Sequence, residues 1–332
     1  MNKSIKSKLC IFLAASTALS LVACSTETPE SDFDNPLPWH DNASTGSYEK
    51  LDYAVKIYDT TTSTAEDART QIADGTLTYT LTESLSDYST YITVNMSMSV
   101  TYFQDAPAPD AGLTDTITST VEFASNSLAV RRMEKTVDLA DRADTANLSY
   151  NVTANYFNEH DEHVATFHYT KQENAEEQTM ALPTDVCRDN EMMFYCARAQ
   201  AIGNNSSTNF KMVNLFDSFN NNKLTEYRIS VSGGETHTMN IGDWVKDYGV
   251  EAVTDEQTGE VSYPVSCTYT SMIINDEKHG PPYVVLYSDK AFTSGGYSHK
   301  KIPVRIEYSQ YTGNSPYRHT EYTLTACDFQ KK

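Results

Sequence analysis

Basic residues are scarce in this chain of 332 residues. It contains 25 Lys and Arg against 45 Asp and Glu, which gives a formal net charge of −20 at pH 7. Nucleic-acid phosphates are bound through a basic surface, so this balance argues against nucleic acid as a partner. It also argues against a domain that lies flat on anionic lipid head groups. An acidic surface is instead typical of a secreted protein that must stay soluble.

Motifs of several enzyme classes are also missing. The chain has no G-x-S-x-G, no H-E-x-x-H and no glycine-rich phosphate loop. These arrangements serve nucleophilic catalysis, zinc-dependent hydrolysis and nucleotide binding. Among 45 acidic residues, no carboxylate pair can be singled out for glycoside chemistry. We therefore expect a protein that is not an enzyme and that uses no cofactor.

Long hydrophobic runs are missing too. A transmembrane helix needs about 20 apolar residues, and no stretch of this chain is that long. The apolar stretch in residues 11–22 is short and interrupted by Ser and Thr, and it follows Lys3, Lys6 and Lys8. A positive start before a short apolar region is typical of a signal peptide, here residues 1–23.

The end of this segment, Leu21-Val22-Ala23-Cys24, resembles the lipobox of bacterial lipoproteins. In that family the cysteine thiol carries a diacylglyceryl group, and acyl chains such as palmitate hold the protein on a membrane. The resemblance implies an extracytoplasmic protein anchored to a bacterial membrane through Cys24. An ordinary secretion signal with an incidental cysteine is the alternative.

Cysteine is rare, and four residues remain after Cys10 and Cys24: Cys187, Cys196, Cys267 and Cys327. An even number in an oxidising compartment permits two disulfides, for which we predict Cys187–Cys196 and Cys267–Cys327. Four buried free thiols are an equally open alternative. The cysteines show no metal-binding spacing, and we expect no metal.

Residues 24–47 are acidic and rich in Pro, Ser, Thr and Asn. This composition buries little apolar surface, so we predict a disordered tether. Phe33, Leu37 and Trp39 are exceptions that could dock onto the domain. Residues 48–332 are expected to form one large β domain.

Alternation of apolar and polar residues dominates that domain. The clearest case is Ile92, Val94, Met96, Met98, Val100 and Tyr102, which predicts a long strand with one dry face. Similar patterns recur around Leu77, Val121, Tyr150 and Tyr263 to Tyr269, separated by polar turns such as SGGE at 232–235. Connections this short predict an antiparallel sheet. Helices are expected at 64–73 (TAEDARTQIA) and 189–201 (DNEMMFYCARAQA).

The second half resembles the domain-of-unknown-function 3108 family of bacterial envelope proteins, which is itself similar to LolA-like open barrels. The resemblance is carried by Tyr195-x-x-Arg198, a strand at 225–231 followed by Gly233-Gly234-Glu235, and the segments 284–289, 302–306 and 321–325. It implies a mainly β fold, a curved antiparallel, partly open β-barrel with a few short helices.

A LolA-like barrel suggests two groups of candidate ligand-binding residues. Met96, Met98 and Tyr102 could line a concavity for acyl chains, although the same alternation is required by any packed sheet. Arg198 and Arg305 could hold an anionic head group at a cavity mouth, or form internal ion pairs. His160, His163 and His168 are read as part of a solvated turn and return strand rather than as a metal site.

These observations predict an anchored extracytoplasmic lipoprotein that binds or carries a hydrophobic or amphipathic ligand in an open β-barrel. The mechanism would be passive, because each buried methylene of the ligand contributes about 0.8 kcal/mol. The alternative is a structural or protein-interaction module of the cell envelope, with a solid barrel, no ligand and an envelope protein as partner.

Overall fold

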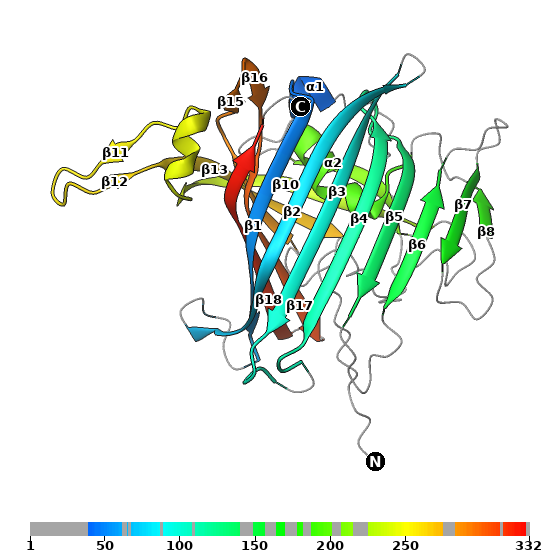
Figure 1. Ribbon diagram of the computed structural model, residues 1–332, viewed down its shortest axis with the longest axis horizontal. Coiled ribbons are helices and arrows are strands. Elements are labelled where there is room, and N and C mark those ends of the chain that lie inside the picture. The colour runs from blue at the N-terminus through cyan, green and yellow to red at the C-terminus, as the bar shows by residue number, and fades with distance from the viewer. Residues whose placement is uncertain are drawn as a thin grey trace.

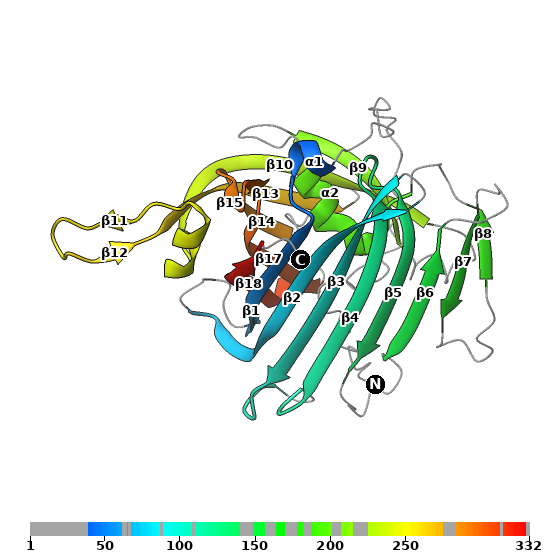
Figure 2. The same ribbon diagram turned by 45° about the horizontal axis from the view of Figure 1, so that its top comes forward.

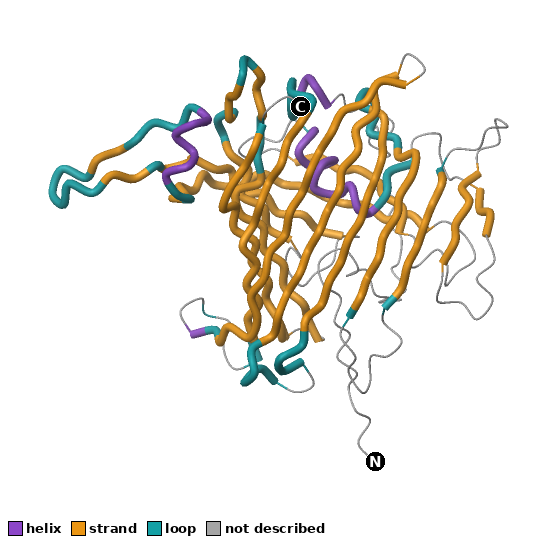
Figure 3. Tube along the Cα trace, viewed as in Figure 1, coloured by secondary structure: helices purple, strands orange, loops and turns teal. Residues whose placement is uncertain are grey.

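The computed structural model describes residues 39–61, 65, 68–86, 89–107, 110–139, 149–156, 164–169, 178–181, 187–200, 207–214, 225–274, 283–312 and 315–329. Strands dominate these residues, and the helical segments are few and short (Figures 1 and 3). The predicted mainly β fold class is therefore confirmed.

Fourteen strands form one sheet in the order β8-β7-β6-β5-β4-β3-β2-β1-β18-β17-β14-β13-β10-β9. Every neighbouring pair in it is antiparallel. Its strands are β1 Tyr48–Asp59, β2 Thr70–Ser86, β3 Ser89–Tyr102, β4 Thr114–Ala124, β5 Val130–Asp138, β6 Tyr150–Asn155, β7 Val164–Tyr169, β8 Gln178–Ala181, β9 Ser207–Asn214, β10 Thr225–Asn240, β13 Pro264–Ile274, β14 Tyr283–Ser288, β17 Pro303–Thr312 and β18 Ser315–Asp328.

The first and last strands lie side by side, which joins the two halves of the chain. β1 pairs with β18, for example through Ala54 and Thr323. The sheet curves, so that β10 and β13 lie opposite β2–β5 with a helix between them (Figure 2). β8 and β9 end the sheet and do not pair with each other in the described residues. The result is an open barrel.

The β3 strand shows why the sequence alternates. Its six apolar residues are all buried, from Ile92 and Val100 at 0% exposed to Met96 at 4%, while the Thr, Asn and Ser residues between them face outward. The predicted dry face is confirmed at these positions. One side of the sheet therefore forms a continuous core.

The SGGE segment is not the turn that its composition predicted. Gly233 and Gly234 lie inside β10, where pairing with β13 shifts between Gly233 and Thr236. Glycine inside a strand often marks such an irregularity. Along β13 the alternation of burial reverses as well, so that Thr270 and Met272 are buried and Tyr269, predicted to face the core, is half-buried.

The predicted helix at 64–73 is wrong in its C-terminal part. Residues from Thr70 onward belong to β2, where Ile72 and Ala73 face the core. Thr70 and Ala73 pair with Asp59 and Ile57 of β1. Sheet pairing therefore overrides a local helix signal of only ten residues.

Residues 39–47, which were predicted to be part of the tether, lie in the folded domain. Helix α1 (Trp39–Asn42) packs onto the barrel, with Trp39 and Ala43 at 0% exposed. The backbone N–H of Trp39 donates to the carbonyl of Ser125 at 2.8 Å. Burial of the Trp39 indole stabilises the packed position of this segment, and this gain outweighs the polar composition that predicted disorder. These residues are therefore part of the domain.

Two smaller hairpins stand outside the main sheet. β15 (Phe292–Ser294) and β16 (Tyr297–His299) are joined by Gly295 and Gly296, whose positive φ angles of 57° and 85° form a tight turn that favours glycine. The second hairpin, an arm made of β11 (Val253–Thr254) and β12 (Val261–Ser262), projects beyond helix η3 (Asp243–Tyr248) (Figure 1).

Candidate functional site

A helical segment occupies the inside of the barrel. It consists of η2 (Asn190–Met192) and α2 (Met193–Ala199), and we call these ten residues, 190–199, the plug. The predicted helix and its cap are confirmed, because the side chain of Asp189 accepts the backbone N–H of Glu191. All seven residues of α2 are buried. A helix that is buried on every side belongs to the core.

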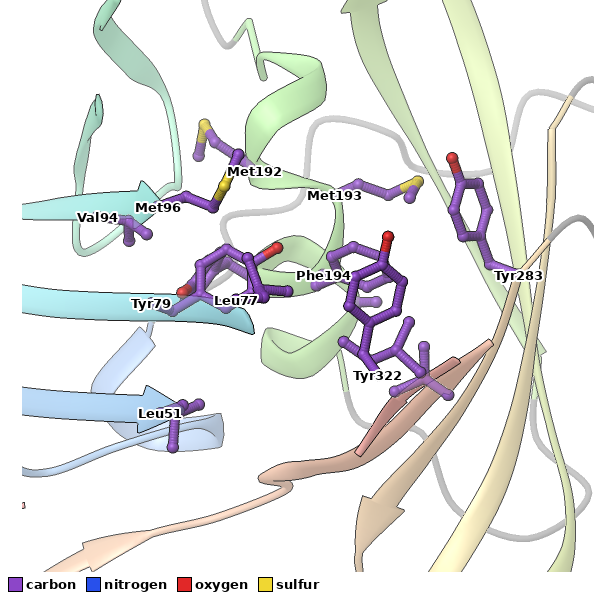
Figure 4. Packing of buried hydrophobic residues seen from close by; sticks show 14 of the residues in the cluster. Leu51, Leu77, Tyr79, Val94, Met96, Met192, Met193, Phe194, Tyr283 and Tyr322 are labelled. Atoms are coloured by element: carbon purple, nitrogen blue, oxygen red, sulfur yellow. The ribbon is translucent and has the colours of Figure 1, made fainter. Parts of the chain in front are cut away.

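The plug contacts both walls of the barrel. The ring of Tyr195 lies 5.8 to 6.4 Å from the rings of Trp39, Tyr79 and Phe123. On the opposite wall, Phe194 packs edge-on against Tyr283 of β14 at 5.8 Å. Figure 4 shows Met192, Met193 and Phe194 of the plug directed at side chains from these two walls.

Little space remains between the plug and strands β1, β2 and β17 in the part of the chain that the structure describes. The cavity beside it, between the plug and the sheet, measures about 10 Å³ and is lined by Leu51, Tyr79, Phe194, Tyr195, Arg198, Pro303 and Ile306. A cavity of this size holds about one water molecule. Pockets for drug-sized ligands measure about 300–1,000 Å³. An acyl chain therefore has no room there in this conformation.

The three predicted acyl-binding residues are part of this packed core. Met96, Met98 and Tyr102 are 4%, 2% and 1% exposed. The hydroxyl of Tyr322 contacts the sulfur of Met98 at 3.9 Å, and Arg318 donates to the hydroxyl of Tyr102 at 3.4 Å. The structure places these residues as plain core, the other reading that their alternation allowed.

Arg198 forms the most elaborate buried contact in the described residues. Its guanidinium donates to both carboxylate oxygens of Glu49 at 2.5 and 2.9 Å, and its Nε donates to the carbonyl of Lys300 at 2.8 Å. It also lies 4.9 Å from the centre of the Trp39 ring. Arg198 is therefore an internal ion-pair residue, the second of the two readings that the sequence allowed.

His299 completes this buried group. Its Nδ1 lies 2.7 Å from Glu49 and 3.1 Å from the Ser44 hydroxyl, and the residue is 0% exposed. The Arg198 group, which we define as Ser44, Glu49, Arg198 and His299, joins the α1 region, β1, the plug and the β15–β16 hairpin. A serine and a carboxylate that share one imidazole nitrogen cannot form the relay of a catalytic triad, which uses both nitrogens.

The electrostatics of Glu49 follow from these partners. Burial acts to raise the pKa of this carboxyl, but Arg198 and His299 outweigh burial and lower the pKa to about 2. Arg198, in turn, keeps its charge because Glu49 outweighs its own desolvation. The pair is ionised throughout the physiological pH range.

Glu49 should therefore give the protein a defined sensitivity to acid. Its pKa in the folded protein lies below its usual value of 4.5. Its contribution is thus fully present above about pH 4.5 and is lost as the pH falls toward 2. We expect this loss to be roughly 3 kcal/mol. Urea titrations at several pH values give the free energy of unfolding of the wild type and of Glu49→Gln. The loss is measured as the difference between the two proteins in how steeply this free energy changes with pH. Parallel slopes below pH 4.5 would contradict the assignment.

Arg305 lies on the outer face of the sheet. Its neighbours Val304 and Ile306 are 0% exposed, whereas its own side chain is 19% exposed. It forms ion pairs with Glu307 at 2.8 Å and with Glu321 at 3.2 Å. Arg305 therefore stabilises a network between neighbouring strands and does not face a cavity. Because Arg198 is buried inside the barrel and Arg305 lies on its outer face, the two residues do not form one head-group site.

The same network contains a row that pairs a hydroxyl, an imidazole and a carboxylate. The Ser309 hydroxyl lies 2.9 Å from Nδ1 of His319, and Nε2 of His319 lies 3.3 Å from Glu321. Burial acts to raise the pKa of Glu321, but His319, Arg305 and Arg69 together lower it. Glu321 also pairs with Arg69 and Arg305, so we read the row as cross-strand packing.

A second buried ionic group, which the sequence analysis missed, lies beside the plug. Lys135 of β5 donates to Glu191 at 2.8 Å, with side chains only 4% and 3% exposed. Tyr156 donates to the carboxylate of Asp189. The sequence did contain a sign of this group: Lys135 occupies the same inward-facing alternation as Met133 and Val137, where a lysine is unexpected.

The four cysteines are free thiols in the structure, so neither predicted disulfide is present. Cys267 on β13 and Cys327 on β18 are separated by β14 and β17. Three strand spacings amount to roughly 14 Å along the sheet, and a disulfide needs Cα atoms within about 7 Å. Cys187 and Cys196 are both buried, and burial raises the pKa of the Cys196 thiol to about 12.

Some predicted positions lie outside the described residues. These are Cys24, His160 and His163, and the side chain of His168. In the part of the chain that the structure describes, no group of His, Cys, Asp and Glu is placed to hold a metal ion. Likewise, none of the described helices is both long and apolar enough to cross a membrane.

Fold and site together define an open, antiparallel β-barrel with a buried helical plug inside it. No family model matches the chain, and no curated protein matches its sequence. Among solved structures, the chain is similar to a beta-barrel-like protein of domain of unknown function DUF1849 from Brucella abortus. The identity is 12%, the TM-score is 0.48, and the match covers 87% of this chain and 100% of that one. The resemblance to the domain-of-unknown-function 3108 family remains an expectation.

Proposed function

We propose that this chain is a lipoprotein of the bacterial cell envelope, anchored through Cys24, whose filled barrel is a structural and protein-interaction module. The observation that supports this choice over a lipid carrier is the occupied interior. Between the plug and β1, β2 and β17, the described residues leave a cavity of only about 10 Å³. A carrier needs space for its ligand, and in this part of the interior the plug takes that space.

The anchor would keep the barrel close to the membrane. Trp39, the first described residue, packs on the barrel and follows Cys24 by 15 positions. A fully extended chain of that length spans at most about 50 Å. The end of the barrel that carries α1 would thus stay within this distance of the lipid.

The β11–β12 arm supports an interaction role. Residues 251–260 are all exposed, and Val253 and Val261 are 52% and 53% exposed. The arm contributes nothing to the core, yet its tip is ordered by Asp255, which accepts the backbone N–H groups of Gln257 and Thr258 at 2.8 Å. An ordered projection outside the core is suited to contact with another protein.

The anchor can be tested by fractionating cells that express the full chain. The wild type is expected in the membrane fraction with a lipid-modified mass, and Cys24→Ser in the soluble extracytoplasmic fraction with an unmodified mass. Equal distribution of the two proteins would overturn the lipid anchor and leave an ordinary secretion signal.

The filled barrel is tested by titrating the purified protein with cis-parinaric acid, a fluorescent fatty acid. No saturable fluorescence change is expected at micromolar concentrations of the probe. Saturable binding by the wild type that is lost in Met96→Trp, a substitution that narrows the interior further, would overturn this proposal and favour a lipid carrier. The companion experiment is cross-linking in intact cells, where a single discrete adduct with one identified envelope protein is expected.

A further inference from the structure

The second buried ionic group lies where residues 187–189 connect β5 with β9. The carbonyl of Cys187 accepts the backbone N–H of Val130 in β5 at 2.8 Å. One residue later, the carbonyl of Arg188 accepts the N–H of Val213 in β9 at 2.7 Å. Asp189 then forms a parallel bridge with Val213. Residues 187–189 thus connect β5 with β9, the last strand at one end of the sheet, and lead directly into the plug.

The side chains at this junction come from three different elements. Lys135 belongs to β5, Tyr156 follows β6, and Glu191 belongs to η2 of the plug. Asp189 accepts from the Tyr156 hydroxyl on one oxygen and from the Glu191 N–H on the other, at 2.8 Å. From β10, the Tyr227 hydroxyl donates to the side chain of Asn190.

The charges in this group do not balance when every acid is ionised. Two carboxylates, Asp189 and Glu191, face one ammonium, Lys135, and Asp189 is only 1% exposed. Arg188 is directed elsewhere and donates to the carbonyl of Ser127 at 3.3 Å. One added proton makes the group neutral, and a neutral buried group avoids the large desolvation cost of a net charge.

Besides the buried guanidinium of Arg188, the titratable groups nearby are of types that are ordinarily uncharged at neutral pH. They are the phenol of Tyr150 on β6 and the thiols of Cys187 and Cys196. The proton therefore falls to a carboxyl group. Burial, and then the neighbouring Glu191, raise the pKa of Asp189 to about 7, against the opposing effects of Tyr156 and Lys135.

We propose that Lys135, Tyr156, Asp189 and Glu191 form a pH-sensitive latch, which fastens the plug to the β5–β9 junction in mildly acidic surroundings and loosens as the pH rises to neutrality. Opening of the latch exposes Asp189 to water, where its pKa returns to about 3.8, so that opening releases a proton. The opening equilibrium therefore rises about tenfold per pH unit between pH 4 and 7. Above pH 7 it levels off, because Asp189 is then ionised in both states.

Hydrogen exchange of the full chain, followed by mass spectrometry from pH 5 to 8 and corrected for intrinsic exchange rates, measures this opening. In the wild type, peptides covering residues 187–199 and 207–214 should open about tenfold more per pH unit up to pH 7 and no more above it. In Asp189→Asn the same peptides should show a flat profile, because the amide keeps an oxygen for the Glu191 N–H and does not titrate.

Two further variants keep the test decisive if Asp189→Asn does not fold. Tyr156→Phe removes a donor to the ionised carboxylate, so its profile should level off at a higher pH than that of the wild type. Asp110→Asn alters a buried carboxylate that pairs with Arg318 at 2.9 Å, away from the junction, and should keep the wild-type profile in these peptides. The same pH profile in the wild type, Asp189→Asn and Tyr156→Phe would overturn the latch. None of these outcomes depends on the lipid anchor or on the partner.

Discussion

Replacement of Arg198 by Met is expected to lower the free energy of unfolding by about 3–5 kcal/mol, because it leaves the carboxylate of Glu49 buried without its main partner. Both side chains are almost fully buried, at 2% and 1% exposed. The variant also loses the hydrogen bond to the Lys300 carbonyl and the contact with Trp39. Urea unfolding at neutral pH measures the effect as a lower midpoint at an unchanged m value.

A matched control is available on the surface. Arg132 forms an ion pair with Glu134 in which the two side chains are 61% and 45% exposed. Arg132→Met should therefore cost less than about 1 kcal/mol. The double variant Arg198→Met, Glu49→Gln should be more stable than Arg198→Met alone, because the stranded charge is removed. Equal midpoints for Arg198→Met and Arg132→Met would show that the buried pair does not stabilise the fold.

The Arg198 pair also shows where reasoning from sequence ends. The sequence identified Arg198 as notable and left an internal ion pair open as one reading. Its partner Glu49 lies 149 positions earlier in the chain. Nothing local in β1 distinguishes this glutamate from the other acids. Long-range pairing is decided by the order of strands, which places β1 beside β18 and wraps both around the plug.

Strands were easier to predict from the sequence than the contacts between segments that are distant in the chain. Met96 and Met98 were placed on the correct face of β3, because a period of two follows directly from strand geometry. Gly233 and Gly234 were misread as a turn, because the same residues serve turns and strand irregularities alike. The central role of residues 190–199 was also missed. A short helix that is apolar on all sides looks the same in sequence whether it caps a barrel or fills it.

Glu49 and Asp189 affect stability in opposite directions. The low pKa of Glu49 makes the fold weaker as the pH falls from 4.5 toward 2. The raised pKa of Asp189 makes the fold stronger as the pH falls from 7 toward 4. From these two residues we infer a stability maximum in mildly acidic solution, near pH 4 to 5. The two buried groups hold different ends of the plug, so a mildly acidic environment should fasten both.

Replacement of Trp39 by Ala is the second change with a large expected effect, about 3–5 kcal/mol of lost stability. The indole is 0% exposed and packs against Phe123 and Tyr195 with ring centroids 6.4 and 5.8 Å apart. It also covers the Arg198 guanidinium, so its removal admits water to the buried ion pair. Urea unfolding followed by far-UV circular dichroism measures the loss without relying on the fluorescence of the deleted residue.

Two controls separate packing from other effects. Trp39→Phe keeps an aromatic ring and removes an indole N–H that has no hydrogen-bond partner in the described residues, so it should retain most of the stability. Leu85→Ala removes a side chain that is 76% exposed and should cost less than about 0.5 kcal/mol. If Trp39→Ala were as harmless as Leu85→Ala, residues 39–44 would not be part of the folded core. A large loss instead places Trp39 inside the domain, because only a residue that is part of the folded core can destabilise that core when it is truncated.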